Sequence, residues 1–317
     1  MTARNHHFLS QCYLRGFTDG ESKNSKLLVF DRVTKKVFQT TPRNVGAERD
    51  FNRVDLEGMD PDALEHALAE IEGAAARGLR KLNEGAPFEG DVRDHVLLLA
   101  GLMHIRSPAR REHLRKFHAE ISEHIMELSL ATRERWEGQV ARMKAAGAEL
   151  GEDIDYDDMK RFVESRQYRI EVPRGRHLEM EFKMFNTIMP LLMERKWVVL
   201  ESNKDIGPFI TSDHPLNLVW KEPDKIPPIY RDSPGHGLRD TVVWFPVTKW
   251  ITLVGEFDGD EGRYLASGPL VSNANSVTTM FAQRQLYAPN FGFNFIFNDG
   301  LIHDGHYLAN VLGKNKN

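Results

Sequence analysis

The two ends of the chain carry strand patterns and its middle carries a helical pattern, and this division limits the possible folds most strongly. Residues 27–40 read as two short strands around a polar turn at Asp31–Lys36, which predicts a hairpin. Strand-like runs return after Lys196 and recur up to Phe297. The predicted fold class is therefore α+β, with a mixed or antiparallel sheet built from N- and C-terminal strands around a long helical middle section.

The helical middle has recognisable starts and breaks. Asp60 and Pro61 can cap and open a helix whose apolar residues recur at helical spacing up to Leu79. A long helical stretch is expected over residues 92–147, with an interruption at Ser107–Pro108 because proline removes a backbone donor. Further helices are predicted at residues 177–195 and 275–287, and later strands at 197–201, 209–211, 216–220, 242–245, 250–254 and 291–297.

We expect a single integrated domain over residues 1–317, in which the charge-dense residues 131–166 form a solvent-exposed helical excursion. The 41% hydrophobic and 28% charged composition is that of a globular protein. A net charge of -4 argues against a uniformly basic nucleic-acid binder, although a local basic groove remains compatible. One cysteine, Cys12, with no apolar signal core and no membrane-length apolar run, predicts a cytoplasmic protein.

The first 51 residues hold hydrogen-bonding groups among side chains that should be buried. His, Gln and Arg mix with Phe, Leu and Tyr in residues 6–17, and residues 43–51 repeat this mixture. Charged groups beside apolar ones are costly unless they are paired, and such groups gather at ligand or reaction sites. The candidate site residues from these two segments are His7, Gln11, Arg15, Glu48, Arg49 and Asp50.

A third polar segment, residues 104–111, contributes two arginines. If one helix runs through it, Arg106 and Arg110 share a face with the apolar Leu99. Guanidinium groups on a core-facing side suit phosphate or carboxylate because of their planar fork. The alternative is that the face rotates at Pro108 and leaves both arginines in solvent.

A fourth segment, residues 209–215, is an apolar strand that ends in Thr-Ser-Asp-His-Pro. Ser212 and Asp213 are candidate site residues here, since functional groups often lie on strand-end loops. Asp213 could equally accept hydrogen bonds from backbone amides in a turn before Pro215. Turn chemistry alone leaves both interpretations open.

No strong catalytic signature is present in the sequence, which lacks HExxH, paired CxxC, Walker-loop and GxSxG motifs. Potential metal ligands are far apart in the chain, so a metal site competes with hydrogen-bonded structural pairs. The cofactor is left open, with Mg²⁺ as one option. The residues that such a metal site would use are His6, His7, Glu48, Asp50, Asp213 and His214.

The four polar segments together resemble the DUF4238 family, a bacterial family of unknown function. Its HxxxQxYLRxF opening is matched from His7 to Phe17, through Gln11, Tyr13, Leu14 and Arg15. The other matching elements are Val29-Phe30-Asp31, Pro42 to Phe51, Arg106 with Pro108 and Arg111, Ser212 to Pro215, and Asn275 with Ala282 to Ala288.

The chain departs from the family pattern at Asn52, where Tyr is usual, and at His214, where Asn is common. The resemblance spans nearly the whole chain in matching order. It implies one domain whose ends meet, and it implies no particular activity.

Two functions of different classes remain open. The first is an enzyme acting on a phosphate-containing substrate, such as a nuclease or nucleotide hydrolase, with nucleic acid or a nucleotide as partner. His7 would be the general acid/base, since imidazole titrates near neutral pH. Arg15, Arg49 and Arg106 would stabilise phosphoryl charge, while Gln11, Arg110 and Ser212 bind substrate. Glu48, Asp50 and Asp213 would orient the histidine or hold Mg²⁺.

The second function is a non-catalytic ligand- or nucleic-acid-binding module in which the same residues form a buried ion-pair network. Both hypotheses share one geometric expectation, because isolated buried charges are expensive. The residues expected to converge are His7, Glu48, Asp50, Arg106 and Asp213. The sequence does not indicate an oligomeric state.

Overall fold

The computed structural model describes residues 5–20, 24–52, 63–148, 155–171, 174–231 and 234–314. The chain divides into two compact units. Unit 1 comprises Met1–Pro108 and Met180–Asn317, and unit 2 comprises Ala109–Glu179. Unit 2 thus begins before the excursion predicted from residue 131, and the predicted single domain stays a prediction. The predicted cap at Asp60–Pro61 lies outside the described residues.

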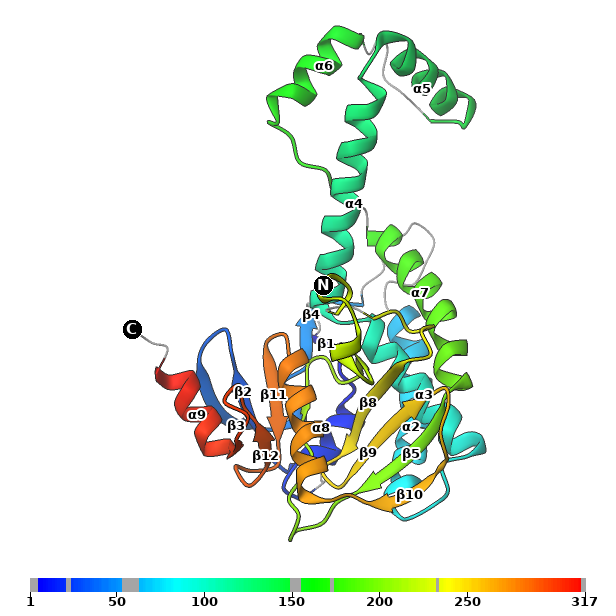
Figure 1. The fold of residues 1–317 in the computed structure, drawn as a ribbon. Coiled ribbons are helices and arrows are strands. Elements are labelled where there is room, and N and C mark those ends of the chain that lie inside the picture. The colour runs from blue at the N-terminus through cyan, green and yellow to red at the C-terminus, as the bar shows by residue number, and fades with distance from the viewer. Residues whose placement is uncertain are drawn as a thin grey trace. The chain divides into compact units, whose positions relative to one another are not determined.

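A five-stranded sheet forms the centre of unit 1 (Figure 1). Its strands pair antiparallel except for β10 with β5, which run parallel. The ladder is irregular between Pro246 and Thr248, where proline has no N–H to donate. The strand order is β10 (Gly262–Leu265), β5 (Lys196–Glu201), β9 (Ile251–Glu256), β8 (Thr241–Thr248) and β7 (Asn217–Trp220).

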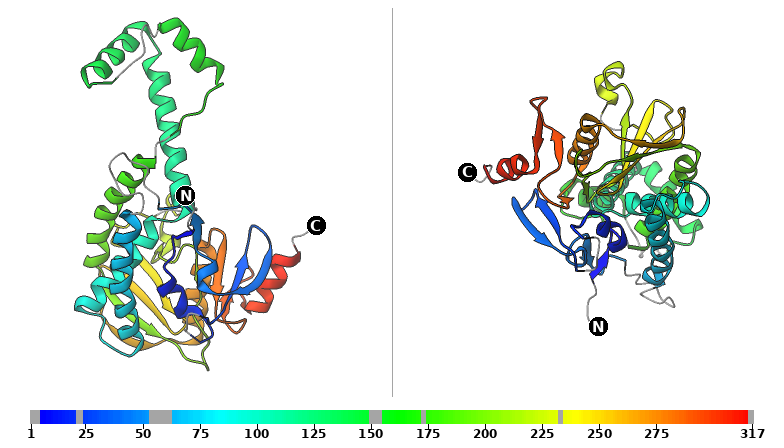
Figure 2. Two further views of the ribbon diagram at one scale, coloured as in Figure 1. Left: turned by 180° about the vertical axis from the view of Figure 1, so that it is seen from behind. Right: turned by 90° about the horizontal axis from the view of Figure 1, so that it is seen from below.

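Alternation along the strands gives this sheet two apolar faces. Val242 and Trp244 of β8 pack with α8 (Gly268–Phe281), whereas Val243 and Phe245 belong to the main core on the other face. That main core also contains buried residues of α2 (Ala63–Asn83), α3 (Gly90–Ile105) and α7 (Arg174–Glu194). Figure 2 shows this helical layer from behind. The sheet therefore lies between two helical layers.

A second, four-stranded sheet joins the two ends of the chain. Its order is β3 (Lys36–Thr40), β2 (Leu27–Asp31), β11 (Gln285–Ala288) and β6 (Thr211–Ser212), and every pair is antiparallel. The predicted hairpin over residues 27–40 is confirmed by β2 and β3. The predicted α+β class, with N- and C-terminal strands sharing a sheet around a helical middle, is also confirmed.

The helix predicted over residues 275–287 was placed incorrectly. The helix is α8, which ends at Phe281, and Gln285–Ala288 is strand β11. β11 pairs with β2 on one side and with β6 on the other. Pairing with two neighbours outweighs the local sequence preference there. The strand predicted over 291–297 is shorter, with β12 (Asn294–Ile296) paired to β13 (Ile302–Asp304) before α9 (Gly305–Lys314).

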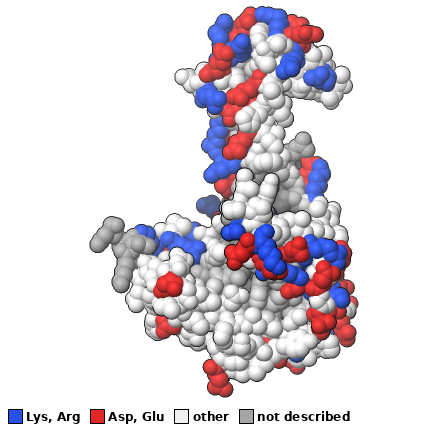
Figure 3. Space-filling model, in the orientation of Figure 1, with Lys and Arg blue, Asp and Glu red and all other residues white. Residues whose placement is uncertain are grey.

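The predicted interruption at Ser107–Pro108 is confirmed, since α3 ends at Ile105 and α4 (Pro108–Ser129) begins at the proline. A second break separates α4 from α5 (Arg133–Ala145), where the Thr132 side chain accepts a hydrogen bond from Arg135 N–H. The next helix is α6 (Tyr156–Ser165), which Asp155 caps in the same way. Figure 3 shows Lys and Arg interspersed with Asp and Glu over these helices.

Among the helices of the described residues, none combines the length and the apolar composition that crossing a bilayer requires.

Candidate functional site

Strand pairing brings the first two polar segments together. β1 (Asn5–His7) runs antiparallel to β4 (Ala47–Arg49), with His6 opposite Glu48. The Gly46 carbonyl also accepts hydrogen bonds from the N–H groups of Phe8 and Leu9. Gly46 has a φ of +64°, and a Cβ on it would lie 2.9 Å from Leu9 Cβ. Only glycine fits this close approach of the two segments.

Asn52 is the centre of a buried hydrogen-bonded cluster. Its backbone N–H donates to His6 Nδ1 at 2.9 Å, and its amide Nδ2 donates to Glu65 Oε2 at 2.7 Å. Its Oδ1 accepts a hydrogen bond from Arg106 Nη2 at 2.7 Å. His6, Asn52 and Arg106 are 3%, 1% and 6% exposed. Three separate segments of the chain therefore meet at one residue, and we call this group the Asn52 cluster.

Glu72 extends the Asn52 cluster by two turns of α2. Burial raises the pKa of its carboxyl, while a hydrogen bond from Ser10 and the charge of Arg106 lower it. Ser10 Oγ also lies 3.0 Å from the Cys12 thiol. Burial raises the pKa of that thiol, so Cys12 stays protonated and is a poor nucleophile.

His7 is half-buried beside this cluster. Burial is the largest influence and lowers the pKa of its imidazole. A hydrogen bond with the Arg43 backbone and the charge of Glu65 raise this pKa, and the charge of His6 lowers it. The imidazole is therefore neutral at neutral pH, which is the form that accepts a proton.

Most other candidates from the two N-terminal segments lie nearer the surface. Glu48 is exposed on β4, and Arg49 pairs with Asp50 at 3.7 Å with its own side chain 76% exposed. Gln11 and Arg15 are half-buried on α1 (Gln11–Leu14) and the turn that follows it. Glu65, rather than Glu48, is the carboxylate hydrogen-bonded within the Asn52 cluster.

Asp213 belongs to a different hydrogen-bonded group. Its two carboxylate oxygens accept hydrogen bonds from Gln283 N–H at 2.9 Å and Arg284 N–H at 2.7 Å. Burial raises the pKa of this carboxyl, and these backbone donors lower it. Ser212 Oγ accepts from His214 N–H in a local turn. Asp213 therefore fixes the connection between α8 and β11, and Ser212 caps a turn.

Arg106 and Arg110 were expected to share a face only if one helix ran through both residues. That condition is not met, since α3 ends at Ile105 and Arg110 belongs to α4. Pro108 has no N–H to donate and stands at the start of the new helix. Arg106 is nevertheless buried and contacts Asn52, so the solvated alternative is excluded for this arginine.

Sequence reasoning missed Glu65, Glu72 and Asn52. Glu65 and Glu72 are seven residues apart on α2, on the same face as the buried Leu68 and Leu79. That interruption of an apolar face was a usable signal. Asn52 gave only a departure from the family pattern, which weakened its apparent role.

Three histidine rings also meet in unit 1. His104 Nε2 and His236 Nε2 are 3.0 Å apart, and the His214 ring centroid lies 5.3 Å from that of His104. His104 and His214 fall within predicted polar segments, whereas His236 does not. His236 is held through its carbonyl, which accepts a hydrogen bond from the buried Arg195.

Within the described ranges, no three His, Cys, Asp or Glu side chains lie in a geometry that could hold a metal ion. The histidines and carboxylates predicted as metal ligands therefore form no such group among the described residues.

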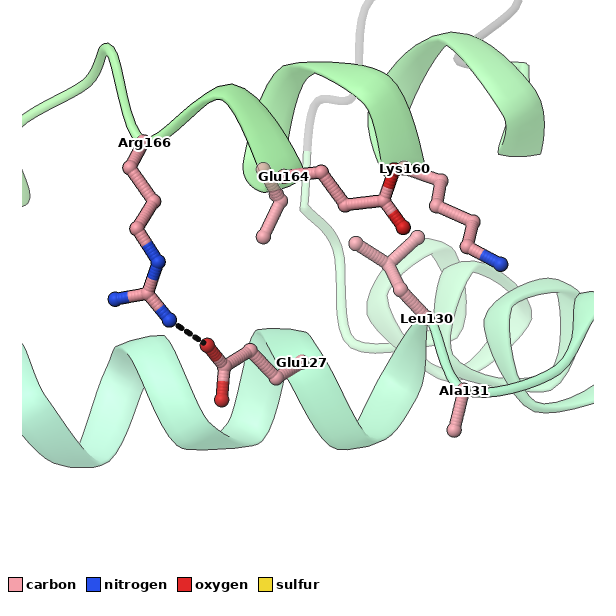
Figure 4. A pocket seen from close by; sticks show the side chains of 7 residues that line it. Glu127, Leu130, Ala131, Lys160, Glu164 and Arg166 are labelled. Carbon is pink, nitrogen blue, oxygen red and sulfur yellow. Dashed lines mark hydrogen bonds and ion pairs between the residues drawn. The ribbon is translucent and has the colours of Figure 1, made fainter.

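A cavity of about 350 Å³ lies within unit 2 (Figure 4). Arg166 Nη2 donates a hydrogen bond to Glu127 Oε1 at 3.0 Å, and this pair closes one side of the cavity. Two basic and two acidic side chains balance each other around an apolar floor, so the cavity offers little net charge to an anion. Its lining residues are Glu127, Leu130, Ala131, Lys160, Val163, Glu164 and Arg166.

Comparison with known proteins gives one match. The family described as "Protein of unknown function (DUF4238)" matches residues 5–290, which include every residue of the Asn52 cluster. No curated protein and no solved structure matches the chain.

Proposed function

Because the chain belongs to the DUF4238 family, whose function is unknown, we propose a function from its own residues. The protein is an enzyme that acts on a phosphate-containing substrate, with the Asn52 cluster and His7 at its active centre. The observation that carries this proposal is that Glu65 and Arg106 share the buried Asn52 side chain, while His7 lies close enough to Glu65 for their charges to interact. Such groupings of a base, a carboxylate and a guanidinium are typical of reaction sites.

His7 is the general base. Its lowered pKa keeps the imidazole neutral at neutral pH. Its Nε2 is buried and has no hydrogen-bond partner among the described residues. The hydrogen bond with the Arg43 backbone therefore falls to Nδ1, which places the lone pair on Nε2. Glu65 favours the cation that forms when this nitrogen takes a proton.

Arg106 supplies the positive charge that a phosphoryl group needs. Asn52 holds its guanidinium, and Glu72 lies close enough for the two charges to interact. A guanidinium fixed before the substrate arrives stabilises developing negative charge without having to reorganise. Arg15 is half-buried on the same N-terminal segment and would add to this field.

The reaction that these groups support is hydrolysis of a phosphate ester. A water oxygen bonds to phosphorus while His7 Nε2 takes the water proton. The bond between phosphorus and the leaving oxygen breaks with its electron pair, and the leaving oxygen takes a proton from the imidazolium. His7 thereby returns to its neutral form.

A nucleotide or nucleic acid is the substrate class that we propose, because its phosphate groups match a histidine–arginine site. The net charge of -4 makes a broad electrostatic surface for nucleic acid a poor fit, so recognition is local. A protein with one cysteine suits the cytoplasm, where we expect it to act.

The second candidate is a non-catalytic module in which the Asn52 cluster is a buried structural network. The observation that favours it is burial, since His6, Asn52 and Arg106 are each at least nine-tenths removed from solvent. Buried charges that satisfy one another are also found where no reaction occurs.

An activity screen separates the two candidates. RNA, DNA and nucleotides are offered to the wild type, to His7→Ala and to the control His306→Ala, with and without divalent metal. His306 is exposed and lies beyond the region matched by the family. The enzyme proposal expects turnover that His7→Ala removes with little change in thermal stability. A structural network expects no turnover and a lower melting temperature for His7→Ala alone.

A further inference from the structure

The tautomer of His6 is fixed by the Asn52 cluster. The backbone N–H of Asn52 donates to His6 Nδ1 at 2.9 Å. A nitrogen that accepts this bond carries a lone pair, so the ring hydrogen must be on Nε2. A backbone amide cannot exchange donor and acceptor roles, and it therefore permits only this tautomer.

The Nε2–H group that results is a buried donor. His6 is 3% exposed, and its Nε2 has no hydrogen-bond partner in the part of the chain that the structure describes. Burying a donor without an acceptor costs free energy, so nearly all buried polar groups are satisfied. An acceptor that arrives with a ligand is one way to satisfy it.

His7 carries the opposite tautomer. Its Nε2 is also buried without a partner among the described residues, but its hydrogen bond with the Arg43 backbone leaves a lone pair there. The two rings leave β1 on opposite sides, because successive side chains of a strand alternate, so the His6 donor faces one side and the His7 acceptor the other. The oxygens of a phosphate ester accept hydrogen bonds, and the His6 donor is the group that can bind one of them.

We propose that His6 Nε2–H is a substrate-binding group that donates a hydrogen bond to a non-bridging phosphoryl oxygen. This inference rests on the proposed function and deepens it, since it assigns a recognised atom to His6, which the sequence indicated only as a potential metal ligand. Asn52 is the positioning residue for His6, since it fixes the tautomer without touching the substrate.

The tautomer is tested first, on the full-length protein labelled with ¹⁵N in its histidine rings. Long-range ¹H–¹⁵N spectra distinguish the two ring tautomers, and the His6→Asn and His7→Asn variants assign the signals. We expect hydrogen on Nε2 of His6 and on Nδ1 of His7. A His6 ring with hydrogen on Nδ1 overturns the proposal.

Binding is tested by titrating inorganic phosphate into the same sample. The expected result is a saturable shift of the His6 Nε2–H signal. A His6 Nε2–H signal that does not shift with phosphate overturns the proposal, whether or not phosphate binds elsewhere on the protein.

Two substitutions separate the donor from the fold. His6→Asn keeps an acceptor for the Asn52 N–H but removes the group at Nε2, and it should weaken phosphate binding about 10–100-fold. His6→Gln places an amide donor near the Nε2 position and should restore part of this loss. Equal phosphate affinity for wild type and His6→Asn, with both proteins folded, contradicts the assignment.

The result also distinguishes this inference from the proposed function. Phosphate binding that shifts His6, combined with no turnover of any phosphate ester, removes the enzyme proposal and leaves the binding role intact. Turnover that depends on His7 but is unchanged in His6→Asn removes the binding role and leaves the enzyme proposal intact.

Discussion

Arg106 Nη2 and Asn52 Oδ1 are joined by a 2.7 Å hydrogen bond across 54 positions of the chain. Arg106 follows the last turn of α3, while Asn52 lies just after β4. The same asparagine donates to His6 from its backbone N–H and to Glu65 from its side chain, so one residue connects the N-terminal segment, α2 and α3. This connection supplies a polar partner for an arginine that is only 6% exposed.

Asn52→Ala should lower the free energy of unfolding by about 1–3 kcal/mol, because it leaves the buried Arg106 and the half-buried Glu65 without their shared partner. Equilibrium urea unfolding measures this change. Asn310→Ala is the matched control, since Asn310 is exposed on α9, and surface changes stay within about 0.5 kcal/mol. Equal loss in both variants would show that the shared amide contributes nothing.

The free energy of unfolding should fall as the pH drops below 6.5, in part through His7, whose folded pKa is lowered from that value. The unfolded chain takes up the proton first, so the contribution of His7 is fully present above 6.5 and is lost as the pH falls toward the folded pKa. His7→Ala should show a shallower pH dependence than wild type. His306→Ala should keep the wild-type slope, and a wild-type slope in His7→Ala would contradict the prediction.

Asp213→Ala should lower the free energy of unfolding by about 1.5–3 kcal/mol, because two backbone N–H groups lose a charged acceptor. The groups are those of Gln283 and Arg284. Chemical unfolding tests this, with Asp240→Ala as the control at an exposed aspartate. Wild-type stability for Asp213→Ala would return Asp213 to the list of candidate catalytic residues.

Tyr13→Phe should lower the free energy of unfolding by about 1–3 kcal/mol, because it removes a fully buried hydroxyl. That hydroxyl donates to the Pro246 carbonyl at 2.7 Å and lies 2.6 Å from Thr211 Oγ1. Tyr230→Phe, at a residue that is 67% exposed, should have almost no effect. A melting temperature equal to wild type for Tyr13→Phe would show that the N-terminal segment is not fixed to the strands by this contact.

The apolar side chains of residues 6–17 were expected to be buried, and the structure confirms this for Phe8, Leu9, Tyr13, Leu14 and Phe17. The aromatic and aliphatic side chains of this segment have to be buried, and burial is a property of residue type that can be read from sequence. Tyr13 stacks on Phe245 with ring centroids 5.5 Å apart, and Phe17 is fully buried. Which strands receive these side chains was decided by the tertiary structure.

The sequence predicted the candidate site less completely than it predicted the burial of the N-terminal segment. His7 and Arg106 stand out in the sequence because they interrupt apolar patterns, and both lie in or beside the Asn52 cluster. Glu65 and Glu72 could have been found because they interrupt the apolar face of α2, whereas the role of Asn52 depends on hydrogen bonds to residues far away in the chain. A sequence pattern reports only how one residue relates to its own element.

The sequence by itself determined the strand-rich ends, the helical middle and the break at Pro108. It also determined that the apolar side chains of the N-terminal segment have to be buried together with polar ones. These features follow from local backbone preference and from the period of the apolar residues. Only the tertiary structure decided that Gln285–Ala288 becomes a strand between β2 and β6, and that Asp213 binds backbone amides near it. Hydrogen bonds between distant segments fixed both outcomes, because each buried donor and acceptor takes whichever partner the fold brings within reach.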